Sequence, residues 1–250
     1  MTRSVAVLSD IYGVLPALDA VLADLENIPV DRIVVTGDIA CGPQPTQVID
    51  RLLELGKHIV WVRGNADREL VDLVQGGDAI HADDISIWAA TQLLPAHVAL
   101  LDSLPHPVVL EIEGFDSVMF CHGTPRDENE IVLVDTGLER WMEVLSDIPS
   151  SVTTVVGGHT HMPFSRIARG RLIVNPGSVG LPYGRPGAYW AILENGSVQM
   201  RRTLFSYADA RESIVRTSGY PAILDWLQDN LDHPSSDDDA LEVFGPHAGR

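Results

Sequence analysis

The chain has 250 residues, 45% of them hydrophobic, so it can bury a sizeable core, and nothing before about residue 232 is typical of a linker. Its formal net charge of -18 argues against binding to duplex DNA or to an anionic membrane, although a bound metal would let a small phosphorylated substrate approach. The sequence begins directly with an apolar strand pattern and no apolar run approaches the ~18 residues of a membrane span, so we expect a cytoplasmic protein without a leader.

The first part of the chain repeats a strand, a polar loop and a helix three times. The expected strands are Ser4 to Leu8, Ile33 to Thr36 and His58 to Val62, and the expected helices are about Pro16 to Glu26, Thr46 to Leu55 and Arg68 to Val74. This alternation is typical of a parallel sheet with helical crossovers. Asp10, Asp38 and Asn65 follow the three strand ends, at the sheet edge where ligands gather in open α/β folds. Asp10 taken alone fits a turn or helix-capping residue equally well.

Residues 76–107 depart from this pattern and form a helical excursion. Asp84 is placed to cap one helix and Pro95 to begin another. The excursion is either a lid over a site or a packing layer that does not contact the substrate. With it included, we expect a single domain over residues 1–232.

The second half contains hairpins and further strand ends with polar residues. Ser117 to Cys121 is an expected strand, and His122 follows it directly. Another β-branched run stops at two glycines and is followed by His159 and His161. Such a loop can direct both imidazoles to one spot, and neutral imidazole is the commonest protein ligand for divalent transition metals. A hydrogen-bonded pair of loop histidines is the alternative interpretation of this motif alone.

A glycine-rich turn and two arginines are candidates for binding a substrate. Asn175, Gly177 and Ser178 form a turn with the polar groups that suit a phosphate. Arg126 and Arg185 could hold two phosphate oxygens through their guanidinium groups, and each fits a surface arginine equally well. Residues 233–250 contain a run of aspartates and few apolar side chains, and we expect a disordered acidic tail there.

Residues with oxygen or nitrogen donors therefore follow strand ends throughout the chain. They are Asp10, Asp38, Asn65, His122, His159 and His161. One carboxylate shared by two cations, with imidazoles and an amide completing each shell, is what a pair of metals ~3.5 to 4 Å apart requires. Such a pair polarises a phosphoryl oxygen and makes a bound water nucleophilic at neutral pH.

The order of these motifs resembles that of the calcineurin-like metallophosphoesterase superfamily. The matching segments are Ser9 to Gly13, Gly37-Asp38, Gly64 to Asp67, His122-Gly123 and Gly158 to His161, within about Ser4 to Thr203. Asn175 to Ser178 resembles the small prokaryotic phosphodiesterase branch of the superfamily. The resemblance implies a four-layer α/β/β/α sandwich of two mixed sheets with a dimetal site at the strand ends.

The resemblance also implies a role for each donor. Asp38 would bridge the two metals, and Asp10 and His161 would bind the first of them. Asn65, His122 and His159 would bind the second metal. Asp38, Asn65 and His122 are on this basis the expected catalytic residues.

Two positions depart from the family pattern. The first motif normally reads Asp-x-His, and Tyr12 stands in place of the histidine. A neutral phenol with a pKa near ~10 is a poor ligand, although Fe³⁺ binds phenolate, so the first metal is expected to be weak, absent or ferric. Many members carry a histidine after the asparagine of the third motif, where it assists the leaving group, and this chain has Ala66. Loss of a positioned general acid costs on the order of 10²-fold on poor leaving groups.

The primary hypothesis is a metal-dependent phosphoesterase, a phosphodiesterase rather than a monoesterase, in which metal-bound hydroxide attacks a small phosphorylated substrate in line. Its expected cofactors are two divalent or mixed-valence transition metals, Mn in the first place and Fe or Zn as alternatives. The alternative is a catalytically weakened scaffold, marked by Tyr12 and Ala66, that binds a nucleotide or a protein partner. A purely structural α/β protein without metal is a third interpretation.

Overall fold

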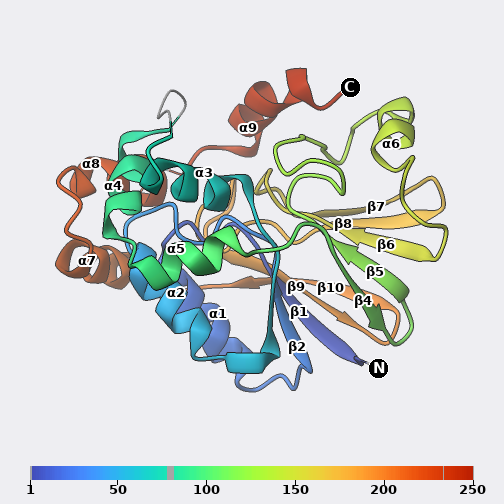
Figure 1. Cartoon of the computed structure of the whole chain (residues 1–250), viewed down its shortest axis with the longest axis horizontal. Coiled ribbons are helices and arrows are strands. Elements are labelled where there is room, and N and C mark those ends of the chain that lie inside the picture. Colours follow the sequence, from blue (N-terminus) through green and yellow to red (C-terminus); the bar gives the residue numbers. More distant parts are fainter. Residues whose placement is uncertain (1, 78–81, 233, 250) are drawn as a thin grey trace.

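Two mixed five-stranded sheets face each other in the computed structural model, which describes residues 2–77, 82–232 and 234–249 (Figure 1). Helices α1 (Leu15–Leu25), α2 (Pro45–Leu53) and α5 (Pro95–Asp102) lie beside the first sheet, and α6 (Leu138–Val144) lies beside the second. This arrangement confirms the expected α/β sandwich of two mixed sheets.

The first sheet has the strand order β10-β9-β1-β2-β3. Its strands are β1 (Ser4–Leu8), β2 (Arg32–Val35), β3 (Ile59–Trp61), β9 (Ala188–Glu194) and β10 (Ser197–Thr203). The strands β1, β2 and β3 are parallel, with Val7 opposite Val34 and Val34 opposite Val60. Because β9 runs antiparallel to β1, the carboxyl ends of the three parallel strands share one edge with the start of β9, and β10 pairs antiparallel with β9 at the edge of the sheet.

The second sheet has the strand order β4-β5-β6-β8-β7. Its strands are β4 (Val108–Ile112), β5 (Asp116–Phe120), β6 (Val152–Val156), β7 (Phe164–Ala168) and β8 (Arg171–Asn175). Parallel pairing of β5, β6 and β8 brings the ends of these three strands together, and the two edge strands run antiparallel. His122, His159 and the Asn175 turn therefore follow neighbouring strand ends.

Nine helices are described, together with three short helical turns. The helices are α1 (Leu15–Leu25), α2 (Pro45–Leu53), α3 (Asn65–Val74), α4 (Asp84–Gln92), α5 (Pro95–Asp102), α6 (Leu138–Val144), α7 (Tyr207–Thr217), α8 (Ile223–Leu227) and α9 (Asp237–Phe244). The turns are Gly56–His58, Gln228–Asp232 and Gly245–His247. Within the described ranges, none of the helices has both the length and the apolar character needed to traverse a lipid bilayer.

Three apolar cores separate the layers, and alternate residues of each strand face different cores. In β1, Ala6 and Leu8 pack against the helices, whereas Val5 and Val7 pack against the other sheet. In β6, Val156 faces the space between the sheets, and Val155 packs with Trp141 of α6. Central strands such as β1 and β2 are thus buried on two faces, which explains why they read as continuous apolar runs, whereas the edge strand β10 is exposed over most of its length.

The helical excursion packs on the rest of the domain. Helices α4 and α5 contact α3, and Ala89 and Leu101 are buried in the core of the first sheet. At its N-terminus, α4 is capped by Asp83, which accepts a hydrogen bond from the Ser86 amide at 2.9 Å. Residues 78–81 of the excursion lie outside the described residues.

The C-terminal segment differs from the expected disordered tail. Helix α9 begins after Ser236, whose hydroxyl accepts a hydrogen bond from the Asp239 amide, and the Asp239 carboxylate accepts one from the Ser236 amide. The aspartate run that suggested disorder lies in the first turn of this helix, where negative charge is favourable. Residues 233 and 250 of the segment lie outside the described residues.

Candidate metal centre

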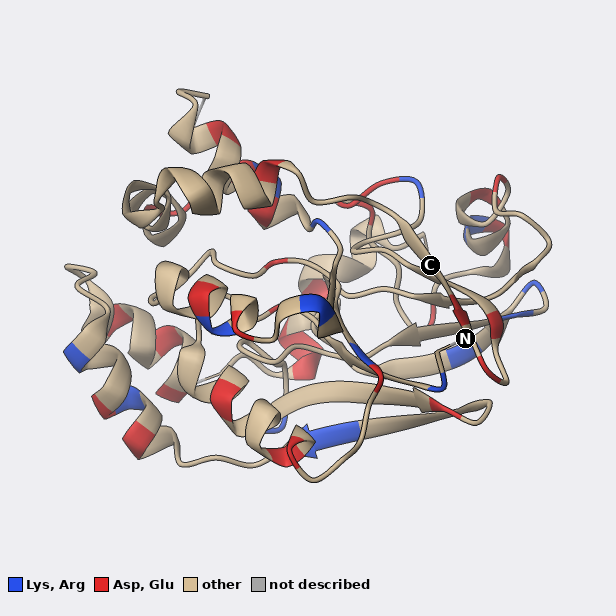
Figure 2. Ribbon diagram, turned by 60° about the horizontal axis from the view of Figure 1, so that its bottom comes forward, with Lys and Arg blue, Asp and Glu red and all other residues tan. Residues whose placement is uncertain are grey.

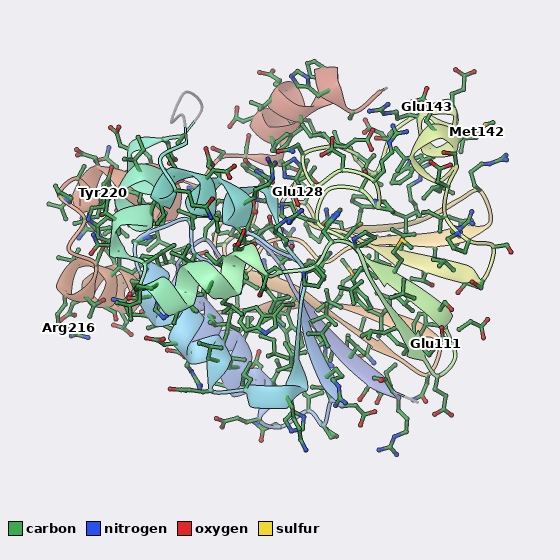
Figure 3. All side chains as sticks on the ribbon, in the orientation of Figure 1. Glu111, Glu128, Met142, Glu143, Arg216 and Tyr220 are labelled. Atoms are coloured by element: carbon green, nitrogen blue, oxygen red, sulfur yellow. The ribbon has the colours of Figure 1, made fainter. Side chains whose placement is uncertain are left out.

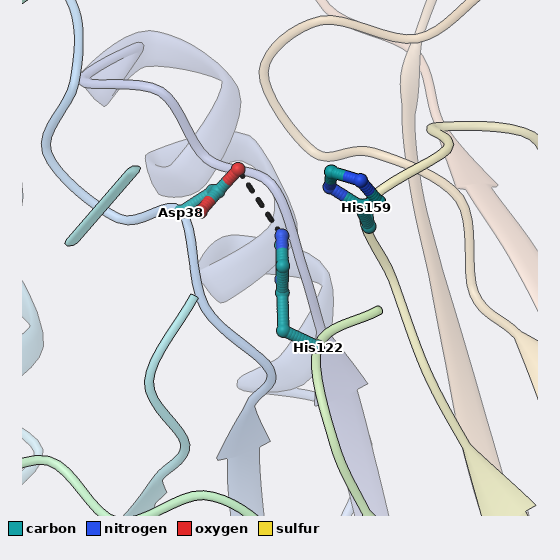
Figure 4. Close-up of side chains that lie close together, drawn as sticks. All are labelled: Asp38, His122 and His159. Atoms are coloured by element: carbon teal, nitrogen blue, oxygen red, sulfur yellow. Dashed lines mark ion pairs between the residues drawn. The ribbon is translucent and has the colours of Figure 1, made fainter. Parts of the chain in front are cut away.

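The loops that follow five parallel strands bring the predicted donor residues together between the two sheets. Asp38 follows β2, His122 follows β5 and His159 follows β6, and one ligand atom of each lies within 4.8 Å of the others (Figure 4). Asp38 and His122 are fully buried. The Nε2 atom of His122 is 3.2 Å from Oδ2 of Asp38, and the His122 and His159 ring centroids are 5.1 Å apart. This group has the residue types and spacing of a transition-metal site.

A second group lies beside it at the end of β1. The Nε2 atom of His161 is 3.3 Å from Oδ1 of Asp10, and Nε2 of His122 is 4.0 Å from the same oxygen. The His159 amide donates a hydrogen bond to Oδ2 of Asp10 at 3.1 Å. Asp10 therefore joins the two sheets at the site and leaves its other oxygen directed toward His161 and His122.

Backbone carbonyls fix the tautomers of two of the histidines. The Nδ1 atom of His122 is 2.7 Å from the Thr36 carbonyl oxygen, and Nδ1 of His161 is 2.7 Å from the Leu181 carbonyl oxygen. A carbonyl oxygen only accepts, so each Nδ1 must carry the proton. In the neutral ring, Nε2 then has a free lone pair that points into the site, as a metal-binding imidazole requires.

Tyr12 is directed at Asp38 rather than into an empty coordination position. Its hydroxyl donates a hydrogen bond to Oδ2 of Asp38 at 2.6 Å. Burial, together with the charges of Asp38 and Asp10, raises the pKa of Tyr12 well above its ordinary value. The side chain is thus a neutral phenol that donates to the proposed bridging carboxylate.

The residues at this centre fit a bound metal, because several of their buried donor atoms have no hydrogen-bond partner within the described structure. These atoms are Oδ1 of Asp10, Oδ1 of Asn65, Nε2 of His122 and Nδ1 of His159. Buried polar atoms are almost always paired, and leaving one unpaired costs about 1–3 kcal/mol. Within the described residues, Oδ1 of Asp10 and Nε2 of His122 otherwise face only ion-pair partners, which require a protonated imidazole, and a coordinated cation would account for these two atoms and for those of Asn65 and His159.

Glycines allow the loops to approach the two carboxylates closely. A Cβ atom at Gly64 would lie 2.2 Å from Oδ1 of Asp38. A Cβ atom at Gly158 would lie 2.0 Å from Oγ of Ser9 and 2.8 Å from Oδ2 of Asp10. Any side chain at either position would displace a donor, so these glycines are part of the site's construction.

Electrostatic coupling sets the protonation of the ligand groups. Burial raises the pKa of Asp38, but the charges of His122 and His159 and the hydrogen bonds from His122 and Tyr12 together outweigh burial and hold that pKa well below the usual range. Burial lowers the pKa of His122, but the charges of Asp38 and Asp10 and the hydrogen bonds to Asp38 and the Thr36 carbonyl together outweigh burial and raise that pKa to about 10. Burial and then the charge of His122 lower the pKa of His159 to about 4. His159 is therefore neutral near pH 7, in the form that binds a metal.

Five residues of the centre have backbone conformations that are rare for residues other than glycine. The φ angles are 56° for Asp10, 49° for Tyr12, 53° for Asp38, 68° for His159 and 56° for His161. A residue with a Cβ atom pays about 1–2 kcal/mol in this left-handed region. Concentration of such strain at one place is typical of functional sites, where surrounding structure holds residues in a required geometry.

The turn that was predicted to bind substrate is hydrogen-bonded to the loops that carry His159 and Asp10. The Asn175 amide nitrogen donates to the Gly158 carbonyl at 2.7 Å, and its oxygen accepts from the Gly177 amide at 2.9 Å. Ser178 donates to the Asp10 carbonyl at 2.7 Å. Asn175 and Ser178 are buried by these contacts, so in this structure they position the loops that carry His159 and Asp10.

The two candidate arginines have different surroundings. The guanidinium of Arg126 donates to both carboxylate oxygens of Glu130, at 2.9 and 2.6 Å. Arg185 is exposed and lines a cavity that also contains Tyr183. Within the described residues, a carboxylate thus engages the guanidinium of Arg126, so Arg185 is the one of the two that we carry forward as a candidate for substrate binding.

Three residues without an assigned role in the sequence turn out to support the centre. Asp67 accepts hydrogen bonds from the Asp38, Ile39 and Gly64 amides at 3.0, 2.9 and 2.9 Å. Burial, and next the charge of Asp38, raises its pKa to about 7. His106 accepts a hydrogen bond from the His122 amide at 3.1 Å through Nε2.

Glu128 joins the loop after β3 to the loop after β5. Figure 3 marks the position of Glu128, which is buried. Its carboxylate pairs with Arg63 at 3.0 Å and with Arg68, two residues that lie on either side of Asn65 in the sequence. The only sequence signal for the role of Asp67 is its place as an acidic residue at the third position of α3, where such a residue can cap the helix. The roles of His106 and Glu128 depend on long-range contacts, for which the sequence carries no local signal.

Comparison with known proteins gives a consistent result. Residues 4–197 match the model of the calcineurin-like phosphoesterase superfamily domain. The phosphodiesterase YfcE of Escherichia coli is 25% identical over 197 residues, which cover 75% of this chain and 85% of that protein. An uncharacterized protein of Methanocaldococcus jannaschii, MJ0912, is 27% identical over 255 residues, covering 91% of this chain and 96% of that protein.

Solved structures resemble the chain over most of its length. A metallophosphoesterase from Sphaerobacter thermophilus is 29% identical, has a TM-score of 0.69, and is matched over 88% of this chain and 96% of its own. The hypothetical protein PH1004 of Pyrococcus horikoshii is 18% identical with a TM-score of 0.74, covers 93% and 99% of the two chains, and shares the fold.

Proposed function

The chain belongs to the calcineurin-like phosphoesterase superfamily, and from that premise we propose that it is a metal-dependent phosphodiesterase that acts on a small phosphorylated substrate. The observation that carries the proposal is the grouping of ligand atoms of Asp38, His122 and His159 within 4.8 Å of one another, together with buried donor atoms of Asp10, Asn65, His122 and His159 that make no hydrogen bond within the described residues. A structural protein would gain nothing from burying these atoms without partners.

Two groups of residues would hold the metals. Asp38, His122, His159 and Asn65 would hold one ion, and Asp10 and His161 would hold the other with Asp38 shared. Bound transition metals would polarise the phosphoryl oxygen and lower the pKa of a water molecule so that it becomes nucleophilic near neutral pH. We propose Mn²⁺ as the metal, with Fe and Zn²⁺ as the alternatives to compare.

The chain's own residues favour a substrate with a good leaving group. Ala66 offers only its backbone amide, which donates to Oδ1 of Asp38 at 2.9 Å. No side chain at this position can protonate the departing oxygen, so poor leaving groups should react slowly. The Thr36 and Leu181 carbonyls hold the rings of His122 and His161 in place during the reaction.

Hydrolysis of bis(p-nitrophenyl) phosphate, compared with p-nitrophenyl phosphate, tests the proposal. We expect metal-dependent turnover that favours the diester and falls by about 100-fold or more in Asp38→Asn, because this change weakens the shared ligand. Asp116→Asn is a matched control, since Asp116 also has a positive φ of 56° but lies exposed at the start of β5. Equal turnover by wild type and Asp38→Asn after metal loading would refute the proposal.

A second candidate function is favoured by Tyr12. Its hydroxyl donates to Asp38 at 2.6 Å, and a weakened first metal site would leave a scaffold that binds a nucleotide or a protein partner without hydrolysing it. Calorimetry with a set of nucleotides separates the two functions. A scaffold binds without turnover under every metal tried, whereas a phosphodiesterase consumes a diester.

A further inference from the structure

We propose that the groove between the 181–189 loop and the C-terminal segment binds the nucleoside part of the substrate, so that the substrate is a nucleoside phosphoester. This inference rests on the proposed function and specifies its substrate class. The groove is a cavity of about 700 Å³, lined among others by Met162, Phe164, Tyr183, Arg185, Tyr189 and Asp237. Pockets of this size hold ligands of the dimensions of a nucleoside.

The groove adjoins the metal centre through an aromatic side chain. The Tyr183 ring stacks on that of His161, with centroids 5.3 Å apart and planes inclined by 24°. Phe244 of α9 contacts the edge of Tyr183, with centroids 5.9 Å apart, and lies 6.5 Å from His159. A phosphate at the metal centre would therefore place its organic substituent against these aromatic rings.

The chemistry of the lining suits each part of a nucleoside. Tyr183 and Tyr189 offer aromatic faces on which a base can stack, and such stacking does not depend on the identity of the base. Asp237 offers a carboxylate, the group that accepts hydrogen bonds from ribose hydroxyls in many nucleotide sites. Arg185 is exposed at the groove and has a guanidinium suited to phosphate oxygens.

The far wall of the groove lies outside the part of the chain that matches the family model. That match ends at residue 197, whereas Pro234, Ser236, Asp237 and Leu241 contribute lining. The wall is tied to the domain at both ends: the Gly184 amide donates to the Ser235 carbonyl at 3.0 Å, and the Gly137 amide donates to the Gly249 carbonyl at 3.1 Å. One wall of the groove therefore comes from outside the matched domain, whereas the rest of its lining lies within it.

Calorimetry with the Mn²⁺-loaded protein tests the inference without relying on turnover. Adenosine 5′-monophosphate and ribose 5-phosphate carry the same phosphate and sugar, and only the first has a base. Loss of base stacking typically weakens binding by roughly 5- to 100-fold. We therefore expect the nucleotide to bind about tenfold more tightly, and Tyr183→Ala to remove that advantage while leaving the affinity for ribose 5-phosphate within about twofold.

Matched variants separate stacking from a structural role. Tyr183→Phe keeps the ring and should retain the advantage of the nucleotide. Tyr220→Ala removes a tyrosine between α7 and α8, apart from α9, and should also retain it (Figure 3). Metal content is measured for each variant, because Tyr183 contacts His161.

Equal affinities of the wild type for the two ligands would overturn the inference. An equal loss of both affinities in Tyr183→Ala would also overturn it, since Tyr183 would then only position His161. Hydrolysis of bis(p-nitrophenyl) phosphate is measured on the same preparation. If the protein hydrolyses the diester but binds both ligands equally, only the proposed role of the groove is refuted. If it binds the nucleotide more tightly but does not hydrolyse the diester, only the proposed phosphodiesterase activity is refuted.

Discussion

At the scale of single residues, the geometry of the candidate centre places several residues in strained backbone conformations. Asp10, Asp38, His159 and His161 occupy the left-handed region although each has a Cβ atom. The hydrogen bond that Asn175 donates to Gly158 and the one that Asp67 accepts from the Asp38 amide hold the strained loops, so the surrounding structure bears the strain. Strain of this kind is expected where function rather than stability selects the residue.

Substitution of His159 by glycine and by alanine isolates this strain. We expect His159→Gly to be more stable than His159→Ala by about 0.5–1 kcal/mol, because only alanine keeps the Cβ penalty at a φ of 68°. Chemical denaturation of the metal-free proteins measures the difference. The same pair at His58, in a short helical turn, should give the opposite order. Equal free energies of unfolding for His159→Ala and His159→Gly would contradict the inferred backbone strain at this position.

We expect Tyr12 to limit how many metals bind tightly. Within the described residues, Asp38, His122 and His159 form a group of three that could hold an ion, and the Tyr12 hydroxyl donates a hydrogen bond to Asp38. We expect one tightly bound Mn²⁺ in the wild type and two in Tyr12→His, measured as metal content after dialysis against buffered Mn²⁺. Tyr12→Phe should retain one. Two tightly bound ions in the wild type would contradict this assignment.

The sequence predicted the positions of the donor residues because each follows a strand end. Parallel pairing then places these ends at one edge, which is why Asp38, His122 and His159 meet. Asp67 and His106 escaped prediction because each acts on the backbone of another loop. Contacts of that kind are set by the packing of the two sheets and leave no pattern in the local sequence.

At the scale of secondary structure elements, the turn after β8 positions the loop after β6 through hydrogen bonds. Asn175 donates to the Gly158 carbonyl at 2.7 Å and to the Thr160 hydroxyl at 3.1 Å. We expect Asn175→Ala to weaken Mn²⁺ binding by about 10- to 100-fold, as is typical when a partner that orients a metal ligand is lost. Calorimetric titration measures this. Asn195→Ala, in the distant β9–β10 turn, is the control. Equal Mn²⁺ affinities of the wild type and Asn175→Ala would refute the positioning role of Asn175.

The elements were predicted with unequal success, for identifiable reasons. The strands β1, β2 and β6 are confirmed because uninterrupted β-branched runs mark them. Helix α3 begins at Asn65, three residues before the predicted start, because Asp67 caps its first turn. Helix α9 was not predicted because it has few apolar residues. One of them, Phe244, packs against Tyr183, which lies far away in the sequence.

At the scale of the whole molecule, the pairing of the two sheets was predicted through the family resemblance rather than through periodicity. Runs such as Val5 to Leu8 indicate burial on both faces but not what covers each face. The core between the sheets joins Val7 and Val34 to Phe120 and Val156, residues that are far apart in the chain. Long-range pairing of this kind has no local sequence signal.

The net charge of -18 should influence how an anionic substrate reaches the site. Acidic residues outnumber basic ones by 35 to 17, and they are distributed over helices and loops around the molecule (Figure 2). We expect kcat/KM for bis(p-nitrophenyl) phosphate to rise about twofold as potassium chloride screens this repulsion over a Debye length of ~10 Å. A fall in kcat/KM with added salt would show that local positive charge dominates the approach.

The central claim is that the loops at the strand ends bind a transition metal at Asp38, His122 and His159. Anomalous X-ray scattering from a crystal soaked in Mn²⁺ tests it most directly, because the signal locates the ion without reference to activity. The account predicts a strong anomalous peak within coordination distance of the Asp38 carboxylate and of both imidazoles. A fully soaked crystal without a peak at these three side chains would contradict it.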